Sequence, residues 1–273
     1  MKFIEKIFTK IYCIFLPRRA GTSLSDNQAY PQVCLDASNK LKYFNKFRRN
    51  TVYASIVETV TRELGKKYLK VLEADKQILG YIEEFKKNDN WGGPVTYDYD
   101  VVGSISPTTL RYIKVLSDLH NFYGSLDGFN ICEIGVGYGG QCRIVNAMFS
   151  PYTYSLVDIQ PALQLAERYL SNYIIGSILS FKTMNELDYK DYDLCISNYA
   201  FSELPRSLQD VYLKKVILKS KMGYITYSDN FTPREFNSYR VEELLKIIPG
   251  AIKIDENPVT GPNSVILWGN RTR

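Results

Sequence analysis

The apolar residues of this chain follow two patterns, and the pattern changes near residue 93. Between residues 34 and 87 they recur at three and four positions, which is the spacing of one face of a helix. Beyond the Asn-, Gly- and Pro-rich segment 88–94, short apolar runs alternate with further helical patterns. We therefore predict a helical accessory region over residues 21–93 and an α/β domain over residues 94–273.

Seven apolar runs in the second part are short enough to be strands. Helical patterns follow the first, second, fourth and fifth of these runs, which favours parallel strands joined by helices. Only a Pro- and Gly-rich loop joins the last two, which predicts an antiparallel hairpin. The runs cover residues 129–134, 154–158, 178–183, 192–198, 223–230, 251–255 and 264–268. The predicted fold class is α/β, with a Rossmann-like, mostly parallel sheet and an antiparallel strand at its C-terminal edge.

Residues 1–20 have the pattern of an amphipathic helix, and residues 21–32 read as a polar linker. One interpretation places residues 1–19 on an anionic membrane surface as a peripheral contact. The other packs this helix on its own domain or on a partner chain. No apolar run approaches the roughly 18 residues of a membrane-spanning helix, so the sequence predicts none.

The first predicted strand of the α/β domain ends in a glycine-rich loop, after which a helical pattern begins. Gly135, Gly137 and Gly140 fit the dinucleotide-binding pattern G-x-G-x-x-G. With Glu133 in front and Gly139 behind, the loop also fits E-x-G-x-G-x-G. That pattern resembles motif I of the class I S-adenosylmethionine-dependent methyltransferases. Because glycines let a ligand approach the backbone closely, the loop predicts an adenosine-bearing cofactor, either S-adenosylmethionine or NAD, unless it is a plain turn.

Asp158 ends the next predicted strand and lies 18 residues after Gly140 (158 − 140). This is near the spacing at which an acidic side chain binds ribose hydroxyls. The alternative is a capping role for the helix that follows. The two roles are compatible, and the preceding strand and glycine loop favour the ribose role.

The charge and cysteine content exclude some classes of function. With 34 basic and 29 acidic residues the net charge is +5, too mild for a nucleic-acid-binding protein. The five cysteines form no C-x-x-C pair, so we expect no zinc site and a reducing, cytoplasmic location.

Several segments together resemble a family of bacterial sugar O-methyltransferases that are found with surface-polysaccharide genes. They are residues 106–112 (S-P-T-T-L-R-Y), 133–141, 197–204 (S-N-Y-A-F-S-E-L) and 223–226, and the similarity covers roughly residues 88–270. The resemblance implies a class I methyltransferase sheet and methyl transfer from S-adenosylmethionine to a sugar hydroxyl. The acceptor would be a surface glycan or its precursor, such as a nucleotide sugar.

Methyl transfer to a hydroxyl needs a base, and side chains beyond the fourth and fifth strands lie where an acceptor enters. Glu203 and Asp229 are the candidate catalytic bases. Alternatively, Glu203 caps or pairs with the next helix, and Asp229 orders the turn before Pro233. Asn198 is a candidate cofactor contact, and Tyr199 a candidate substrate contact.

Asp229 and Asn230 also resemble the magnesium site of catechol-type O-methyltransferases, in which a metal would orient two adjacent hydroxyls. Those enzymes carry an acid at the end of the fourth strand, where this chain has Asn198. The departure makes a divalent metal doubtful, and Asn230 remains a candidate substrate contact.

The predicted helix before the first strand carries Arg111 and ends at His120, the only histidine. A guanidinium there could bind the methionine carboxylate of the cofactor, or it could be an ordinary surface arginine. His120 precedes the amino end of the first strand, whereas ligands bind beyond the carboxyl ends. We therefore expect a structural role for His120.

Two other functions fit part of the pattern. An NAD-dependent oxidoreductase would use the same glycine loop, although the terminal strand pair and the segment 197–204 count against it. A non-catalytic Rossmann-like scaffold in glycan assembly would keep the fold and lack methyl transfer.

Overall fold

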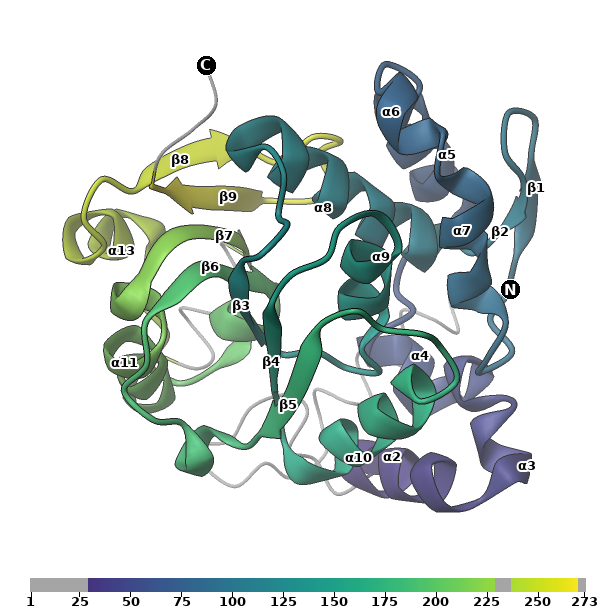
Figure 1. Ribbon diagram of the computed structural model, residues 1–273, viewed down its shortest axis with the longest axis horizontal. Coiled ribbons are helices and arrows are strands. Elements are labelled where there is room, and N and C mark those ends of the chain that lie inside the picture. The colour runs from purple at the N-terminus through teal and green to yellow at the C-terminus, as the bar shows by residue number, and fades with distance from the viewer. Residues whose placement is uncertain (1–28, 229–236, 270–273) are drawn as a thin grey trace.

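The computed structural model describes residues 29–228 and 237–269 (Figure 1). The predicted amphipathic helix 1–20 and the candidates Asp229 and Asn230 lie outside the described residues. Each helix in the described ranges is too short or too polar to cross a lipid bilayer.

The centre of the molecule is a seven-stranded sheet in the order β5-β4-β3-β6-β7-β9-β8. All neighbouring strands are parallel except where β9 pairs with β7 and β8. The strands are β3 (Asn130–Ile134), β4 (Thr153–Val157), β5 (Ile178–Lys182), β6 (Tyr192–Asn198), β7 (Ser220–Ser228), β8 (Ile252–Asp255) and β9 (Asn263–Trp268). The predicted Rossmann-like, mostly parallel α/β sheet is confirmed.

The C-terminal hairpin differs from the prediction in one detail that affects the site. The antiparallel strand β9 lies between β7 and β8, so that β8 and not β9 forms the edge of the sheet. Because β9 is antiparallel to both neighbours, β8 runs in the same direction as β7. The carboxyl end of β8 therefore opens at the same sheet edge as the carboxyl ends of β3, β6 and β7.

Helices cover both faces of the sheet (Figure 1). One face carries α8 (Pro107–Tyr123), α9 (Gly140–Met148) and α10 (Gln160–Leu170), and the other carries α11 (Arg206–Lys215) and α13 (Val241–Ile247). Successive side chains of a strand point to opposite faces. The two cores accordingly take alternate residues of each central strand.

Helix α8 begins at Pro107 and continues to Tyr123, past the predicted end at His120. The backbone N–H of Thr109 donates to the Ser106 hydroxyl at 3.1 Å, and Pro107 occupies the first turn. At the other end, the His120 ring nitrogens lie 3.1 Å from the Gly124 carbonyl and 3.2 Å from Gln77 Oε1. These local contacts fit the structural role expected for His120.

The accessory region consists of short helices. They are α2 (Ala29–Asn39), α3 (Leu41–Phe44), α4 (Thr51–Ile56), α5 (Arg62–Leu72), α6 (Lys76–Leu79) and α7 (Ile82–Lys86), with 3₁₀ turns at Phe47–Arg49 and Lys87–Asp89. The prediction of a linker up to residue 32 is wrong, because α2 begins at Ala29. The helical pattern of residues 34–87 is divided among these short helices, and the Thr61 side chain caps α5.

The remaining elements are small. A two-stranded hairpin, β1 (Tyr97–Tyr99) with β2 (Gly103–Ile105), precedes α8 and was not predicted. Further 3₁₀ turns lie at Met184–Glu186, Ala200–Glu203 and Ile217–Lys219.

A buried ion cluster joins the accessory region to the α/β domain. Arg48 is 1% exposed, and its guanidinium donates to Glu58 at 2.6 Å, to Asp89 at 2.8 Å and to the Ser106 hydroxyl at 3.0 Å. It also lies 4.8 Å from the ring centre of Tyr138 in the glycine loop. The accessory helices and one face of the sheet share a continuous apolar core. Residues 29–93 are therefore packed as part of the α/β domain.

Replacing Arg48 by methionine is expected to lower the free energy of unfolding by about 3–5 kcal/mol, because two carboxylates are left buried without their cation. Urea unfolding at pH 7 measures this loss. The exposed Lys66 offers the matched substitution Lys66→Met, which is expected to change stability by less than about 0.5 kcal/mol. Equal effects of the two substitutions would contradict the role given to the cluster.

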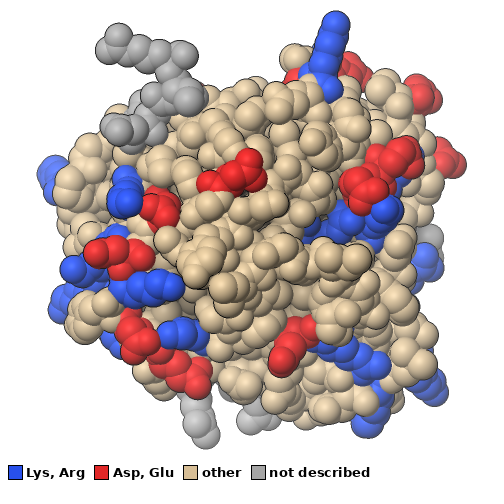
Figure 2. All heavy atoms as spheres, in the orientation of Figure 1, with Lys and Arg blue, Asp and Glu red and all other residues tan. Residues whose placement is uncertain are grey.

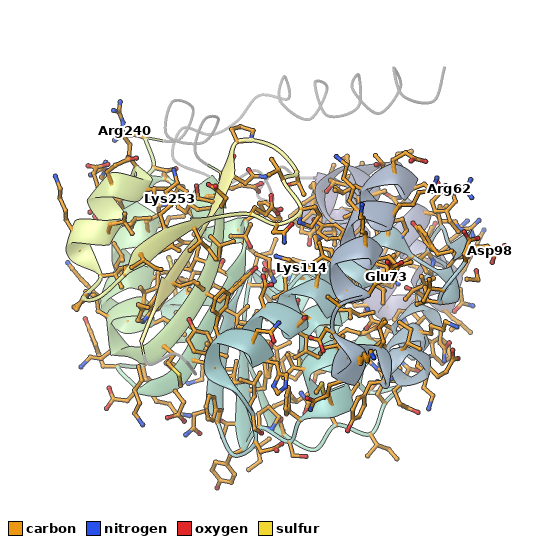
Figure 3. The ribbon with its side chains drawn as sticks, turned by 90° about the horizontal axis from the view of Figure 1, so that it is seen from above. Arg62, Glu73, Asp98, Lys114, Arg240 and Lys253 are labelled. Atoms are coloured by element: carbon orange, nitrogen blue, oxygen red, sulfur yellow. The ribbon has the colours of Figure 1, made fainter. Side chains whose placement is uncertain are left out.

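Surface charges of both signs are interspersed on the face in Figure 2, around a broad uncharged centre. Viewed from above in Figure 3, Arg62 and Asp98 lie at the periphery, whereas Lys114 lies between α8 and the sheet. Lys114 is only 4% exposed. Helix α8 thus places a buried ammonium near the carboxyl edge of the sheet.

Candidate active site

The glycine loop follows the carboxyl end of β3 and packs against Ala200. Gly135 has φ of +79°, and a Cβ added there would lie 2.0 Å from the Cβ of Ala200. Only glycine meets both the backbone conformation and the close approach. The loop thereby sits where the sheet order changes direction, between β3 and β6, which is where open α/β sheets bind ligands.

Asp158 lies beside this loop, as the sequence predicts. Its Oδ2 accepts a hydrogen bond from the backbone N–H of Gly137 at 3.0 Å, and its Oδ1 accepts from the N–H of Ile159 at 2.7 Å. The residue that caps α10 is Ile159, so the alternative that Asp158 is the N-cap is wrong. The arrangement holds a carboxylate against the glycine loop.

Glu133 is buried beneath the same loop at 3% exposure. The Tyr154 hydroxyl donates to its Oε2 at 2.7 Å. Burial raises the pKa of Glu133 from its ordinary value of 4.5 to about 8, and the nearby negative charge of Asp158 adds to the increase. At neutral pH this carboxyl group is therefore mainly protonated and offers a hydrogen-bond donor next to the predicted cofactor loop.

The raised pKa of Glu133 predicts a pH dependence of stability. Between about pH 4.5 and 8 the folded chain holds a proton that the unfolded chain releases, so this contribution to stability falls as the pH rises. The slope is about 1.4 kcal/mol per pH unit. Glu133→Gln cannot ionise, so we expect it to gain stability relative to the parent from pH 5.5 to 8. Parallel urea-unfolding midpoints for the two proteins over this range would contradict the buried, protonated state.

The next two candidates, Asn198 and Tyr199, lie at the end of β6. The Asn198 amide is 3.5 Å from Gln141 in the first turn of α9, and its Oδ1 is 3.5 Å from the Thr226 hydroxyl on β7. Tyr199 has φ of +68°, which is uncommon for a bulky residue and costs about 1–3 kcal/mol. Its backbone N–H donates to the Thr226 carbonyl at 2.9 Å, which helps to hold this conformation.

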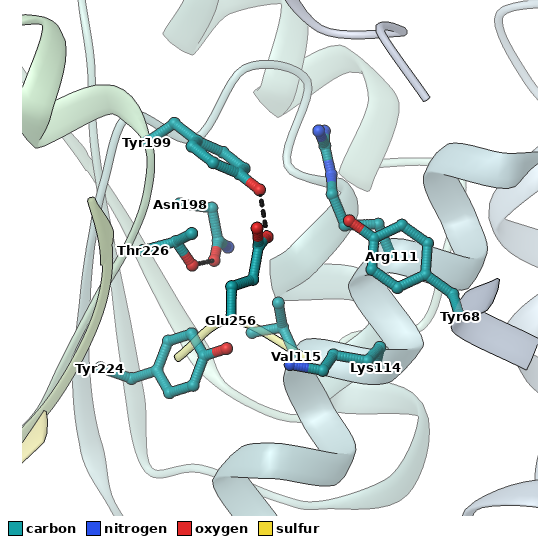
Figure 4. A pocket seen from close by; sticks show the side chains of 9 residues that line it. All are labelled: Tyr68, Arg111, Lys114, Val115, Asn198, Tyr199, Tyr224, Thr226 and Glu256. Carbon is teal, nitrogen blue, oxygen red and sulfur yellow. Dashed lines mark hydrogen bonds between the residues drawn. The ribbon is translucent and has the colours of Figure 1, made fainter. Parts of the chain in front are cut away.

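Beyond Asn198 lies a small polar cavity of about 10 Å³, roughly the space of one water molecule (Figure 4). Helix α5 contributes Tyr68, α8 contributes Arg111 and Lys114, β6 contributes Asn198, and the loop after β8 contributes Glu256. Residues of the accessory region, of α8 and of the C-terminal hairpin therefore meet at this cavity.

Glu256 is the functional candidate that the sequence analysis missed. It is 5% exposed, and its carboxylate accepts hydrogen bonds from the Tyr199 hydroxyl, from Thr260 and, at 3.2 Å, from the Asn263 amide. Figure 4 shows the Tyr199 hydroxyl and the Glu256 carboxylate meeting across the cavity. The available signal was an acid directly after a strand, but it becomes informative only once β8 is known to run parallel to β7.

Lys114 is paired with Asp118 on the next turn of α8. The ammonium lies 2.5 Å from Asp118 Oδ2, which also accepts from the Tyr224 hydroxyl at 2.7 Å. Burial raises the pKa of Asp118, although Lys114 and Tyr224 oppose the shift. Asp118 therefore balances the positive charge of Lys114 at the cavity wall.

Arg111, unlike Lys114, has no ion-pair partner among the described residues. One of its terminal nitrogens donates to the Val57 carbonyl at 3.1 Å, and its guanidinium lies 5.8 Å from the ring centre of Tyr199. Its buried Nε has no hydrogen-bond partner among the described residues. The interpretation as a surface arginine is wrong, because this nitrogen is enclosed at the cavity.

Within the described residues, two other buried side-chain atoms lack a hydrogen-bond partner, the hydroxyl oxygens of Tyr53 and Tyr68. Tyr68 lines the cavity beside Arg111, and Tyr53 lies over Gly137 of the glycine loop. Buried polar atoms in folded proteins are nearly always satisfied, and exceptions mark functional places. All three unsatisfied atoms lie at the carboxyl edge of the sheet.

The structure thus brings most of the predicted site residues to one edge. Glu133, Gly135, Gly137, Gly139 and Asp158 gather around the glycine loop, and Arg111, Asn198 and Tyr199 lie at the cavity. Glu203 is half-buried in the 3₁₀ turn after Tyr199, outside the cavity lining, and stays a prediction.

Neither a metal centre nor a disulfide emerges from the described part of the chain. Residues 29–228 and 237–269 contain no group of three or more His, Cys, Asp and Glu side chains that could hold a metal ion. Cys34, Cys132, Cys142 and Cys195 are buried free thiols, and burial raises the pKa of each.

No family model matches the chain, and no curated protein sequence is similar to it. Its fold is similar to several solved structures. One is magnesium protoporphyrin IX methyltransferase from Synechocystis, with 13% identity, a TM-score of 0.46, and coverage of 57% of this chain and 80% of that one. Another is the N-methyltransferase NodS from Bradyrhizobium japonicum, with 11% identity, a TM-score of 0.45, and coverage of 57% and 83%. A third is an S-adenosylmethionine-dependent methyltransferase from Clostridium acetobutylicum, with 11% identity, a TM-score of 0.44, and coverage of 59% and 90%.

Proposed function

We propose that this chain is an S-adenosylmethionine-dependent O-methyltransferase that acts on a sugar hydroxyl of a surface glycan or its precursor. The observation that carries the proposal is a pair of charged groups on one sheet edge. Asp158 lies against the glycine loop at one end, and the incompletely satisfied guanidinium of Arg111 lies beyond Asn198 at the other.

The two charged groups suit the two ends of this cofactor. The carboxylate of Asp158 can accept hydrogen bonds from ribose hydroxyls, while Gly137 allows the ligand close to the backbone. The guanidinium of Arg111 suits the methionine carboxylate, because a charge-assisted hydrogen bond satisfies its buried Nε. NAD lacks an amino-acid carboxylate but carries a diphosphate, which a guanidinium also binds, so titration with both ligands distinguishes the two functions.

When bound, the cofactor supplies a methyl group on a positively charged sulfur. The chain must orient a hydroxyl in line with that methyl group and remove a proton from it. In the proposed reaction the acceptor oxygen would take the methyl carbon, and the electron pair of the broken carbon–sulfur bond would stay on sulfur. The acceptor proton passes to the Tyr199 oxygen as the proton of Tyr199 passes to Glu256.

The cavity geometry supports this proton path. Tyr199 already donates to Glu256, which is held by Thr260 and Asn263, so the tyrosine oxygen has a lone pair free for an acceptor hydroxyl. A space of about 10 Å³ holds one water-sized group, and not both a methionine carboxylate at Arg111 and a sugar hydroxyl at Tyr199. We therefore expect α5 or the β8–β9 loop to move when the acceptor binds.

The resemblance to sugar O-methyltransferases supplies the substrate class in this proposal. Glycan assembly places the acceptor, a nucleotide sugar or a lipid-linked glycan, at the cytoplasmic side of the membrane. Residues 1–19 would then provide a peripheral membrane contact. A divalent metal has no part in the proposed reaction, although Asp229 and Asn230 stay candidates for substrate contact.

The function is tested by incubating the full chain with isotope-labelled S-adenosylmethionine and a panel of deoxyhexose-containing glycans and nucleotide sugars. Mass spectrometry is expected to show one added labelled methyl group on a sugar oxygen, with or without EDTA. Transfer to nitrogen or to a non-sugar oxygen would overturn the substrate class. Cofactor binding without transfer to any acceptor would favour the scaffold.

A further inference from the structure

The accessory helix α4 lies over the glycine loop and carries Tyr53 there. Tyr53 is 0% exposed, its ring stacks on Tyr30 at 5.6 Å between ring centres, and the Phe47 ring packs nearly perpendicular to it at 5.0 Å between ring centres. Aromatic neighbours on two sides fix the direction of the ring. The position of the hydroxyl is therefore set by the packing of α2, α4 and the turn before α4.

That hydroxyl points to the predicted cofactor loop. A Cβ added at Gly137 would lie 3.7 Å from the Tyr53 oxygen and 3.7 Å from Val57. The backbone N–H of Gly137 in turn donates to Asp158. A phenol hydroxyl, a left-handed glycine and a carboxylate thus converge where an adenosine ribose would lie.

The hydroxyl has no hydrogen-bond partner among the described residues. Enclosing an unsatisfied phenol costs about 1–3 kcal/mol, whereas phenylalanine would keep the same ring contacts without that cost. Burial also raises the pKa of Tyr53, so the phenol keeps its proton and remains a donor. Packing alone gives no reason for an oxygen at this position.

We propose that the Tyr53 hydroxyl binds the ribose of the cofactor opposite Asp158, so that the accessory region completes the cofactor site. The inference rests on the proposed function for the identity of the ligand. Asp158 accepts from ribose hydroxyls, and Tyr53 donates to a ribose oxygen. The accessory helices then belong to the cofactor site in addition to their packing role.

The test compares two ligands by isothermal titration with the full chain. S-adenosylhomocysteine carries both ribose and amino acid, whereas 5′-methylthioadenosine carries the ribose without the amino acid. Tyr53→Phe is expected to weaken both ligands by the same factor, about 3- to 10-fold. In the absence of ligand, Tyr53→Phe is expected to unfold at the same or a higher temperature than the parent, because an unsatisfied polar group has been removed.

Tyr123→Phe is the matched control, because it also removes one buried hydroxyl. Tyr123 lies at the far end of α8, where its hydroxyl donates to the Gly223 carbonyl at 2.6 Å. This variant is expected to lose stability and to keep the affinity for both ligands. Unchanged affinity of Tyr53→Phe would overturn the inference while leaving the proposed function intact.

The two proposals fail in different ways. If the parent chain binds neither adenosine ligand, the proposed function fails first and the inference fails with it. If Tyr53→Phe weakens S-adenosylhomocysteine but not 5′-methylthioadenosine, the hydroxyl contacts the amino-acid end and the ribose assignment is overturned.

Discussion

Arg111→Met is expected to weaken the binding of S-adenosylhomocysteine by roughly 10- to 100-fold. A hydrogen bond to a charged group contributes about 1.5–3 kcal/mol, and tenfold in affinity corresponds to about 1.4 kcal/mol. The buried Nε of Arg111 has no other partner among the described residues, so a ligand carboxylate is the natural acceptor. Methionine keeps much of the side-chain volume and removes the charge.

Two comparisons make the test of Arg111 specific. Binding of 5′-methylthioadenosine, which lacks the carboxylate, should change less than about twofold in the same variant. The exposed Arg62 offers the control Arg62→Met, which should leave both affinities unchanged. An equal loss for both ligands in Arg111→Met would indicate a general disturbance of the site and would contradict the assigned contact.

Glu256→Gln and Tyr199→Phe are each expected to lower kcat by about 10²- to 10⁴-fold, the contribution of a positioned base. Glutamine can still accept a hydrogen bond from Tyr199 but cannot take its proton. Phenylalanine removes the atom that would receive the acceptor proton. Because Tyr199 and Glu256 line the same cavity as Arg111, the affinity of each variant for S-adenosylhomocysteine is measured as well, and the loss in kcat is expected to exceed any loss in that affinity.

The turnover test uses the acceptor that the labelled-donor panel identifies. The exposed Glu73 supplies the control Glu73→Gln, for which we expect parental turnover. Glu203→Gln distinguishes the base predicted from sequence from the one seen at the cavity. A large loss in Glu203→Gln with full activity in Glu256→Gln would move the base to Glu203 and contradict the proton path.

Local patterns were sufficient to predict most of the sheet. Each predicted strand has a counterpart within a few residues, because apolar runs bounded by glycine- and proline-rich turns are a local signal. The position of Asp158 beside the glycine loop was predictable for the same reason, since it follows one strand at a fixed distance from that loop. Its role in binding a ribose stays a prediction. The start of α8 at Pro107 likewise follows from its serine cap.

The missed residues depend on long-range packing. Glu256 reaches the cavity only because β9 inserts between β7 and β8, and no local pattern specifies that order. Tyr53 lies within the helical pattern of residues 34–87, and its place over Gly137 depends on how α4 packs. The left-handed backbone of Tyr199 is likewise held by contacts with β7 and not by its own residue type.

The central claim is that the glycine loop, Asp158 and Arg111 hold S-adenosylmethionine, and titration calorimetry of the unaltered chain tests it most directly. We expect S-adenosylhomocysteine to bind at one site per chain and NAD to give no heat of binding at the same concentrations. Binding of NAD with no binding of S-adenosylhomocysteine would contradict the account.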